Sequence, residues 1–186
     1  MADWKLYMVL LGCKPPGRCT EQHDIFFGIG ETLADLKTAM QQFWKEAPKI
    51  HIDAWREVGV VNGYRVTVEE RAAEASYPNS QTLFFINLGG YRKNEFDEFH
   101  YKLLAVAATS GEAVQSAKET AFYRHTGFEG AHAHIDDKYG VDVDDIINIE
   151  EILSVQYKNR YRLRLQQQAG QPADTLHLGY LKWEKI

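Results

Sequence analysis

The tripeptide His51-Ile52-Asp53 returns unchanged as His134-Ile135-Asp136. An acid and a histidine two residues apart precede each copy, as Glu21-Gln22-His23 and as Glu98-Phe99-His100. The same order of polar residues therefore occurs in both halves of the chain. A self-match of this kind indicates a structural duplication.

The match between the halves extends into the apolar residues around these motifs. Positions 6–32 align with positions 83–109 at an offset of 77. The identical pairs are Leu6/Leu83, Leu11/Leu88, Gly12/Gly89, Glu21/Glu98, His23/His100 and Thr32/Thr109. After an insertion the match resumes at an offset of 83, which pairs His51 with His134 and Asp53 with Asp136.

Apolar runs and turn residues predict a ββαββ order in the first half. Strands are expected at 6–11, 21–30, 50–61 and 64–68, with one helix after the second strand. Thr32 followed by Asp35 is typical of a helix start, because the hydroxyl accepts an amide of the first turn. Thr109 and Glu112 repeat this pattern. Asn62-Gly63 predicts a hairpin turn, since both residues tolerate positive φ.

These elements predict an α+β protein made of two tandem ββαββ repeats related by a pseudo-twofold axis, plus a C-terminal β-hairpin. The expected domains are residues 1–80 for the first repeat, 81–153 for the second, and 154–186 for a basic hairpin packed on the repeats. Within that tail, Arg160, Arg162 and Arg164 alternate with apolar residues, which predicts a half-buried strand with a basic face.

The composition is that of an ordinary globular protein. The 186 residues are 45% hydrophobic and 25% charged, with a formal charge of −5. This acidic balance makes nucleic-acid binding unlikely as a general role. Two cysteines are too few for a disulfide framework, and no apolar run reaches the length of a membrane span. We therefore expect a cytoplasmic protein without a membrane association.

Three longer stretches resemble the bacterial domain of unknown function 1543 family. They are 21–30, which contains Glu-Gln-His-Asp and Phe-Phe-Gly-Ile-Gly; 51–58, which reads His-Ile-Asp-Ala-Trp-Arg-Glu-Val; and 134–146. The resemblance covers about residues 6–153 and implies a tandem two-copy member, since the family carries its domain once or twice. It implies a bacterial protein and assigns no catalytic residue.

The repeated polar residues are the candidate site residues. Residues two apart on a strand point to the same face, so each half can gather imidazoles and carboxylates. The ligand-binding candidates are Glu21, His23, His51, Asp53, Glu98, His100, His134 and Asp136. Imidazole with carboxylate is ligand chemistry for a divalent metal, with His51, Asp53, His134 and Asp136 as candidates. It is also the chemistry of general acid–base catalysis.

The sequence leaves several functions open. The first is a non-enzymatic module that binds a small polar ligand, a metal or a partner protein through these clusters. The second is a hydrolase-like enzyme with His51 or His134 as general base, oriented by Asp53 or Asp136. The third is binding of an anionic partner by the C-terminal basic hairpin. The same His–Asp pairs could instead serve only structure, as hydrogen-bonded elements of a core, and the chain could form oligomers.

Overall fold

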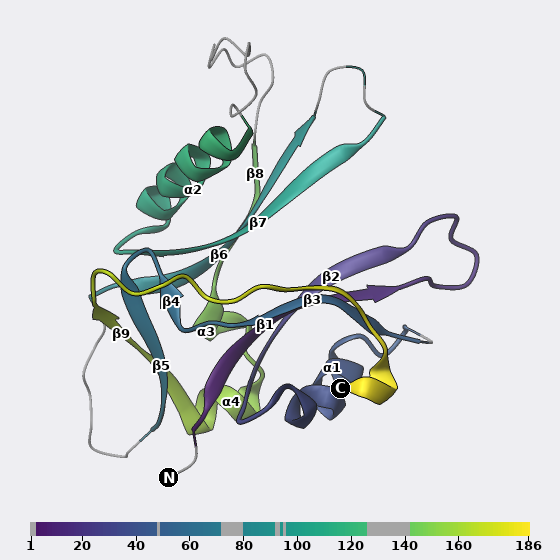
Figure 1. The fold of residues 1–186 in the computed structure, drawn as a ribbon, viewed down its shortest axis with the longest axis horizontal. Coiled ribbons are helices and arrows are strands. Elements are labelled where there is room, and N and C mark those ends of the chain that lie inside the picture. The colour runs from purple at the N-terminus through teal and green to yellow at the C-terminus, as the bar shows by residue number, and fades with distance from the viewer. Residues whose placement is uncertain (1–2, 48, 72–79, 92–93, 95, 126–141) are drawn as a thin grey trace. The chain divides into compact units, whose positions relative to one another are not determined.

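The structure is a computed structural model, and it describes residues 3–47, 49–71, 80–91, 94, 96–125 and 142–186. The chain forms two compact units, Met1–Ser76 with Leu153–Ile186, and Tyr77–Ile152. We refer to them as unit 1 and unit 2. Strands and helices occur in both, so the α+β class is confirmed (Figure 1).

Unit 1 contains two antiparallel sheets. Its elements are β1 (Lys5–Cys13), β2 (Gln22–Gly30), the 3-10 helix η1 (Leu33–Leu36), α1 (Lys37–Phe43), β3 (His51–Glu57), β4 (Val60–Val61), β5 (Tyr64–Glu70), α4 (Val155–Arg160), β9 (Tyr161–Gln167), β10 (His177–Leu181) and the 3-10 helix η3 (Trp183–Lys185). The larger sheet has the order β10-β3-β1-β2, and the smaller has the order β4-β5-β9.

The core of unit 1 lies between the larger sheet and the helix that follows β2. Alternate residues of β1, including Val9 and Leu11, are fully buried on one face of the sheet. Met40 of α1 packs in the same cluster, so α1 covers this face. The helix begins where Thr32 and Asp35 predicted, and the Thr32 amide donates to the Asp35 carboxylate at 2.8 Å.

The predicted continuous strand over 50–61 is wrong, because the chain leaves the larger sheet after Glu57. The Asp174 carboxylate accepts the amides of Gly59 and Val60 at 3.1 and 2.9 Å, which satisfies backbone groups that a continuous sheet would have paired. The predicted turn at Asn62-Gly63 is confirmed, with φ of 49° and 77°. It joins β4 to β5, which pairs with β9 in the smaller sheet.

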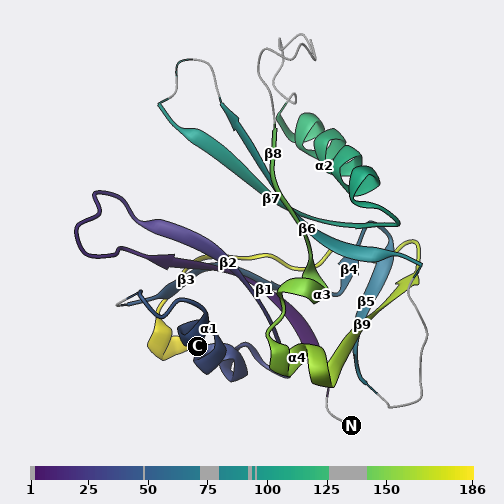
Figure 2. The same ribbon diagram turned by 180° about the vertical axis from the view of Figure 1, so that it is seen from behind.

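The predicted C-terminal hairpin is also wrong. β9 pairs with β5 and β10 pairs with β3, so the two tail strands belong to different sheets. The charged residues of β5 explain why β9 pairs with this strand. Glu69 of β5 contacts Arg162 at 2.8 Å and Arg164 at 3.0 Å, so opposite charges face each other across this pair. Figure 2 shows β9 beside β5.

Unit 2 is a three-stranded antiparallel sheet with helices. Its elements are β6 (Thr82–Tyr91), β7 (Glu98–Ala107), α2 (Ser110–His125), β8 (Asp142–Asn148) and α3 (Ile149–Ile152), with strand order β7-β6-β8. Ala113 and Ala117 of α2 are buried against the sheet. The Glu112 amide donates to the Thr109 hydroxyl at 3.3 Å, which confirms the second predicted helix start.

The two units repeat one strand register. In unit 1, β1 pairs with β2 from Lys5↔Gly30 to Cys13↔Gln22. In unit 2, β6 pairs with β7 from Thr82↔Ala107 onward, which is the same pairing displaced by 77 residues. Central strand, hairpin partner and third strand follow the same order in both sheets. None of the helices in the described ranges has the length and apolar character needed to cross a membrane.

Candidate functional site

The strand register of unit 1 brings the candidate residues of the first half together. β1 lies between β2 and β3, and its residue Gly12 pairs with His23 on one side and His51 on the other. Glu21 directly precedes β2. Because Leu11 faces the core and side chains alternate along a strand, the Gly12 position belongs to the opposite face, away from α1.

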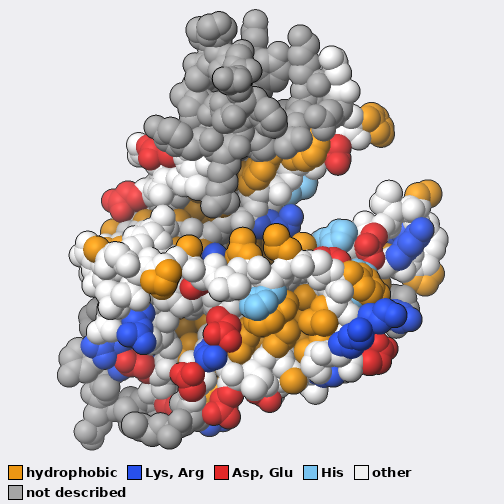
Figure 3. Space-filling model, in the orientation of Figure 1, with side chains coloured by type: hydrophobic (Ala, Val, Ile, Leu, Met, Phe, Trp, Pro, Cys, Tyr) orange, Lys and Arg blue, Asp and Glu red, His pale blue; other side chains and the backbone are white. Residues whose placement is uncertain are grey.

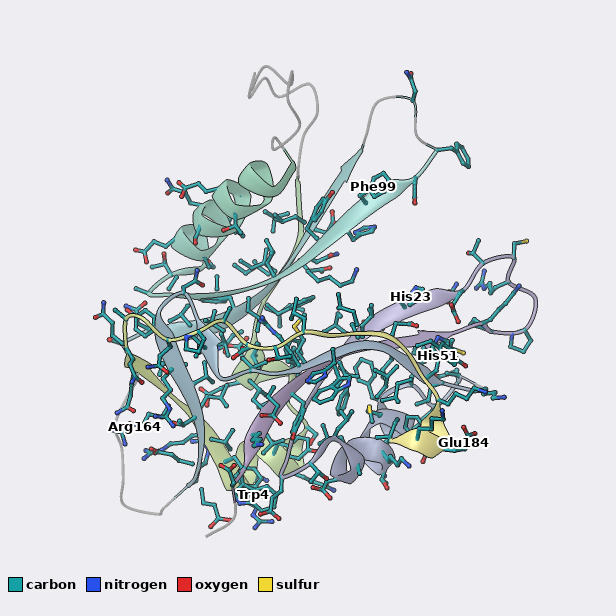
Figure 4. All side chains as sticks on the ribbon, in the orientation of Figure 1. Trp4, His23, His51, Phe99, Arg164 and Glu184 are labelled. Carbon is teal, nitrogen blue, oxygen red and sulfur yellow. The ribbon has the colours of Figure 1, made fainter. Side chains whose placement is uncertain are left out.

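A β-bulge in β3 directs Asp53 toward this face. Leu11 pairs with Ile52 and Leu10 pairs with Ala54, so Asp53 is the extra residue without a partner on β1. A bulge re-aims the side chains around it and bends the strand. It therefore places the Asp53 carboxylate beside the imidazole of His51. Figure 4 shows His23 and His51 at the same end of the sheet.

The four side chains form a ring of alternating imidazoles and carboxylates, which we call the unit 1 cluster. His51 Nε2 lies 3.2 Å from Glu21 Oε1 and 3.3 Å from Asp53 Oδ2. His23 Nε2 lies 3.2 Å from Asp53 Oδ2 and 3.8 Å from Glu21 Oε2. The structure thus joins all four candidates of the first half.

Burial differs across the cluster. The His51 side chain is only 9% exposed, whereas those of His23 and Glu21 are 40% and 41% exposed. His51 Nε2 and Asp53 Oδ2 are buried atoms, and neither has a hydrogen-bond partner among the described residues. Their 3.3 Å contact is longer than a charge-assisted hydrogen bond, which measures about 2.7 to 2.9 Å. Both atoms therefore make ion-pair contacts without a hydrogen bond, which is a costly arrangement for buried polar atoms.

Gly12 makes the close approach of the cluster possible. A Cβ atom at this position would lie 2.4 Å from both Asp53 Oδ2 and His51 Nε2. Any side chain here would push the imidazole or the carboxylate out of place. The glycine that repeats at an offset of 77 therefore belongs to the site, although it carries no functional group.

Aromatic rings border the buried histidine. The ring of Tyr180 on β10 lies over His51, with centroids 4.4 Å apart. Tyr180 is 61% exposed, so one side of this contact is open to solvent. The open side is consistent with Figure 3, where histidine surface lies beside acidic side chains near β2. The sheet and Tyr180 thus enclose His51, whereas His23 and Glu21 of the unit 1 cluster reach solvent.

Unit 2 has a related but different set, which we call the unit 2 cluster. His100 Nδ1 lies 3.0 Å from Asp144 Oδ2, and its Nε2 lies 4.0 Å from Glu98 Oε2. Asn87 Nδ2 lies 3.4 Å from Asp144 Oδ2. Gly89 takes the role of Gly12, since a Cβ there would meet Asp144 Oδ2 at 2.5 Å.

Strand pairing relates β3 of unit 1 to β8 of unit 2 by an offset that differs from the offset of the sequence match. Gly89 pairs with Asp142 as Gly12 pairs with His51, and a bulge between Asn87 and Leu88 repeats the one in β3. The register counterparts of His51 and Asp53 in β8 are therefore Asp142 and Asp144, at an offset of 91 rather than 83. The predicted His134 and Asp136 lie outside the described residues.

Asn87 and Asp144 are the residues that sequence reasoning missed. The signal available was the spacing of Asp142 and Asp144, two acids two apart ahead of an apolar pair, as in a half-buried strand. The exact repetition of His-Ile-Asp at 134–136 instead predicted His134 and Asp136 as the counterparts of His51 and Asp53. Short identical motifs do not carry register, whereas strand pairing does.

The basic strand of the tail is already paired within unit 1. Arg160 contacts Glu70 at 2.9 Å, and Arg162 and Arg164 both contact Glu69. The guanidinium hydrogen bonds, that of Arg164 first, hold the pKa of Glu69 below its ordinary value. Both cysteines are free thiols; Cys13 is buried on the core face and Cys19 is exposed.

Comparison with known proteins finds a family model that matches part of the chain. Residues 18–68 match Domain of Unknown Function (DUF1543). The match supports the predicted resemblance, and the DUF1543 segment contains all four residues of the unit 1 cluster. No curated protein matches the chain.

A solved structure shares the fold of the whole chain. The crystal structure of a protein Il1583 from Idiomarina loihiensis is 22% identical, with a TM-score of 0.62, and the likeness covers 96% of each chain. At this identity the likeness shows the fold alone. It therefore extends the fold beyond the DUF1543 segment without assigning an activity.

Proposed function

We propose that the unit 1 cluster binds a small divalent cation, and that the protein acts as a binding module rather than as an enzyme. The observation that carries the proposal is the pair of buried atoms His51 Nε2 and Asp53 Oδ2, which lie 3.3 Å apart and have no hydrogen bond among the described residues. Imidazole and carboxylate are suitable ligands for zinc and related ions. A cation between these atoms satisfies both of them at once.

The spacing of the cluster favours a metal ion over an organic cation. Zinc ligands at about 2.0 to 2.2 Å from the ion are about 3.3 to 3.6 Å apart at tetrahedral angles. The contacts in the cluster span 3.2 to 3.8 Å. Acceptors around an ammonium nitrogen, at hydrogen-bond distances of about 2.9 Å, would be about 4.7 Å apart. An ammonium group therefore requires the cluster to open.

The proposed site is an open one. Among the described residues, no three or more His, Cys, Asp and Glu side chains already form a group that could hold a metal ion. The proposal therefore relies on two protein donors, His51 and Asp53, with water completing the coordination of the ion. Such a site exchanges its ion readily, unlike a closed structural zinc site with four protein ligands.

A purely structural role is the strongest competitor. Protonated histidines paired with Glu21 and Asp53 would also bring these groups close. The two readings differ in what a substitution changes. Loss of a structural ion pair lowers stability with or without added metal, whereas loss of a ligand removes the stabilisation that metal adds.

Calorimetric titration of untagged, chelator-stripped full-length protein with zinc, manganese and magnesium tests the proposal. We expect zinc to bind with one site per chain in unit 1 and to raise the melting temperature. Asp53→Asn keeps the shape of the side chain and removes its charge, and it should weaken zinc binding at least about tenfold. His51→Ala should abolish the increase in melting temperature.

His177→Ala is the matched control, because His177 lies in the same sheet and stacks on Trp55 at 3.8 Å rather than joining the cluster. Its zinc affinity should equal that of the unsubstituted protein. Absence of binding in the unsubstituted protein, or equal binding in His51→Ala and His177→Ala, would overturn the proposal. A stability loss in His51→Ala that is independent of metal would assign the cluster a structural role.

We further propose that the chain carries two copies of one ββα plan with a third strand. The shared register at an offset of 77 and the repeated bulge support a duplication. The expected fourth strand of the first repeat is β5, which lies in the smaller sheet, and the positions of its counterpart in the second repeat form α3. The pseudo-twofold axis and the ββαββ layout of each repeat stay predictions. So do the bacterial origin, the cytoplasmic location, a partner protein or oligomer, the hydrolase-like alternative and the binding of an anionic partner by the tail.

A further inference from the structure

A cavity separate from the unit 1 cluster lies between the end of α1 and the C-terminal segment. Its volume is about 330 Å³, at the lower end of the range for small-molecule sites. The wall is formed by Trp44, Lys45 and Lys49 after α1, and by Trp183 and Glu184 of η3. Figure 1 shows η3 beside α1, although the two are far apart in sequence.

Two indole rings give the cavity an apolar, aromatic wall. Trp44 and Trp183 are both half-buried and pack against the core of unit 1. Lys37 Nζ lies 6.0 Å from the centroid of the Trp183 ring, which places a cation near this indole. Because both residues pack against the core, their rings are held in place before a ligand binds.

Positive charge dominates the rim. Lys45, Lys49 and Glu184 are exposed, and none of the three forms an ion pair with another described residue. The lining thus contains two lysines and one glutamate as its charged residues, so the charge of the rim is net positive. Lys and Arg side chains gather beside the C-terminal segment in Figure 3, and Figure 4 labels Glu184 there.

We infer that this cavity binds a small aromatic carboxylate. The ring of the ligand contacts Trp44 and Trp183, and its carboxylate lies between Lys45 and Lys49. Aromatic contact supplies most of the binding energy, because exposed charge pairs contribute little. The lysines therefore select an anionic ligand over a neutral one of the same shape.

Fluorescence titration of the full-length protein with 2-naphthoate tests the inference, with the neutral 2-naphthamide as the matched probe. Naphthoate should quench tryptophan emission, and Trp183→Phe should remove most of that quenching. Lys45→Met and Lys49→Met should each weaken naphthoate binding by up to about fivefold without changing naphthamide binding. Glu184→Gln should strengthen naphthoate binding about twofold.

Lys14→Met is the charge-matched control, because Lys14 is an exposed lysine of the β1–β2 loop. It should leave both titrations unchanged, and circular dichroism of all variants should match the unsubstituted protein. Equal affinity for the two probes, or no saturable quenching by naphthoate, would overturn the inference. A weakening by Lys14→Met as large as that by Lys45→Met would reduce the effect to overall charge and would also overturn it. These outcomes do not depend on metal binding at the unit 1 cluster.

Discussion

The two clusters occupy the same register position on two sheets but carry different side chains. Gly12 pairs with His51 in unit 1, and Gly89 pairs with Asp142 in unit 2. Both sheets place a bulged aspartate next to that pair. Unit 1 therefore presents imidazoles from two strands, whereas unit 2 has a carboxylate residue where the buried histidine stands. The strand register is therefore repeated in the two units, whereas the set of polar side chains is not.

Burial sharpens this difference. His51 is enclosed by its sheet and by Tyr180, and its Nε2 has no hydrogen-bond partner in the described part of the chain. The Asp144 side chain in unit 2 is 31% exposed and contacts His100 directly at 3.0 Å. The unit 1 cluster thus leaves His51 Nε2 and Asp53 Oδ2 without a hydrogen bond, whereas the unit 2 cluster makes the His100–Asp144 contact and leaves only Asn87 Oδ1 of its described atoms in that condition.

Substitution of Gly12 and Gly89 by alanine is the strongest test of this difference between the clusters. Gly12→Ala should lower the free energy of unfolding by about 2 to 3 kcal/mol, since its Cβ meets the buried His51 ring. Gly89→Ala should cost less than about 1 kcal/mol, because the exposed Asp144 side chain can move aside. Urea denaturation measures both. Equal losses would show that burial does not distinguish the clusters.

Asp174 gives a second test. Its carboxylate connects the C-terminal segment to the start of β4, and this contact lies within unit 1. Asp174→Ala should lower the free energy of unfolding by about 1 to 3 kcal/mol, since the amides of Gly59 and Val60 lose their acceptor. Asp174→Asn retains one acceptor oxygen and should cost less. Amide hydrogen exchange should increase in β4 and stay constant in β6, and an increase in β6 would contradict the assignment.

Asp174 also has a defined pH dependence. Desolvation by burial raises the pKa of its carboxyl above the ordinary value, despite the hydrogen bonds from Gly59 and Val60. A raised pKa means that the folded state binds the proton more tightly than the unfolded state does. The stability that this proton adds is present at low pH and is lost as pH rises through the folded pKa. The Asp174→Asn variant should therefore lose this part of the pH dependence.

Converting one donor set into the other tests the cluster comparison itself. His51→Asp gives unit 1 the residue found at the matching position of unit 2. Zinc affinity should fall about tenfold, because a nitrogen ligand is lost, while manganese affinity should fall less, because carboxylates suit harder ions. Calorimetric titration with both ions gives the ratio. An unchanged zinc-to-manganese ratio would contradict a ligand role for His51.

The smallest expected effect concerns the β5–β9 pair, which belongs to unit 1 alone. Glu69→Gln should cost less than about 1 kcal/mol at neutral pH. The pKa of Glu69 is lowered, so its stabilisation is present above the ordinary carboxyl pKa and is lost as pH falls through the folded value. Unfolding curves of the variant and the unsubstituted protein should therefore converge in acid. Glu31→Gln, in the loop after β2, serves as a control for general charge effects.

Local signals in the sequence were enough to predict several elements. The offset of 77 predicted the matching β1–β2 and β6–β7 hairpins, because a hairpin depends on neighbouring residues and its alternation of faces. Thr32 and Thr109 predicted both helix starts, and Asn62-Gly63 predicted the turn between β4 and β5. The polar residues Glu21, His23, His51 and Asp53 were identified as candidates because their pattern recurs in the second half, whereas their proximity depends on the strand order.

Only the tertiary structure decided how distant segments combine. The sequence could not place β9 on β5 or β10 on β3, because strands far apart in the chain pair according to charge and burial across the sheet. It could not find Asp144 as the counterpart of Asp53, because a single bulge sets which side chain of a strand faces the site. Local conformation follows from neighbouring residues, whereas register and strand partners depend on the packing of the whole unit.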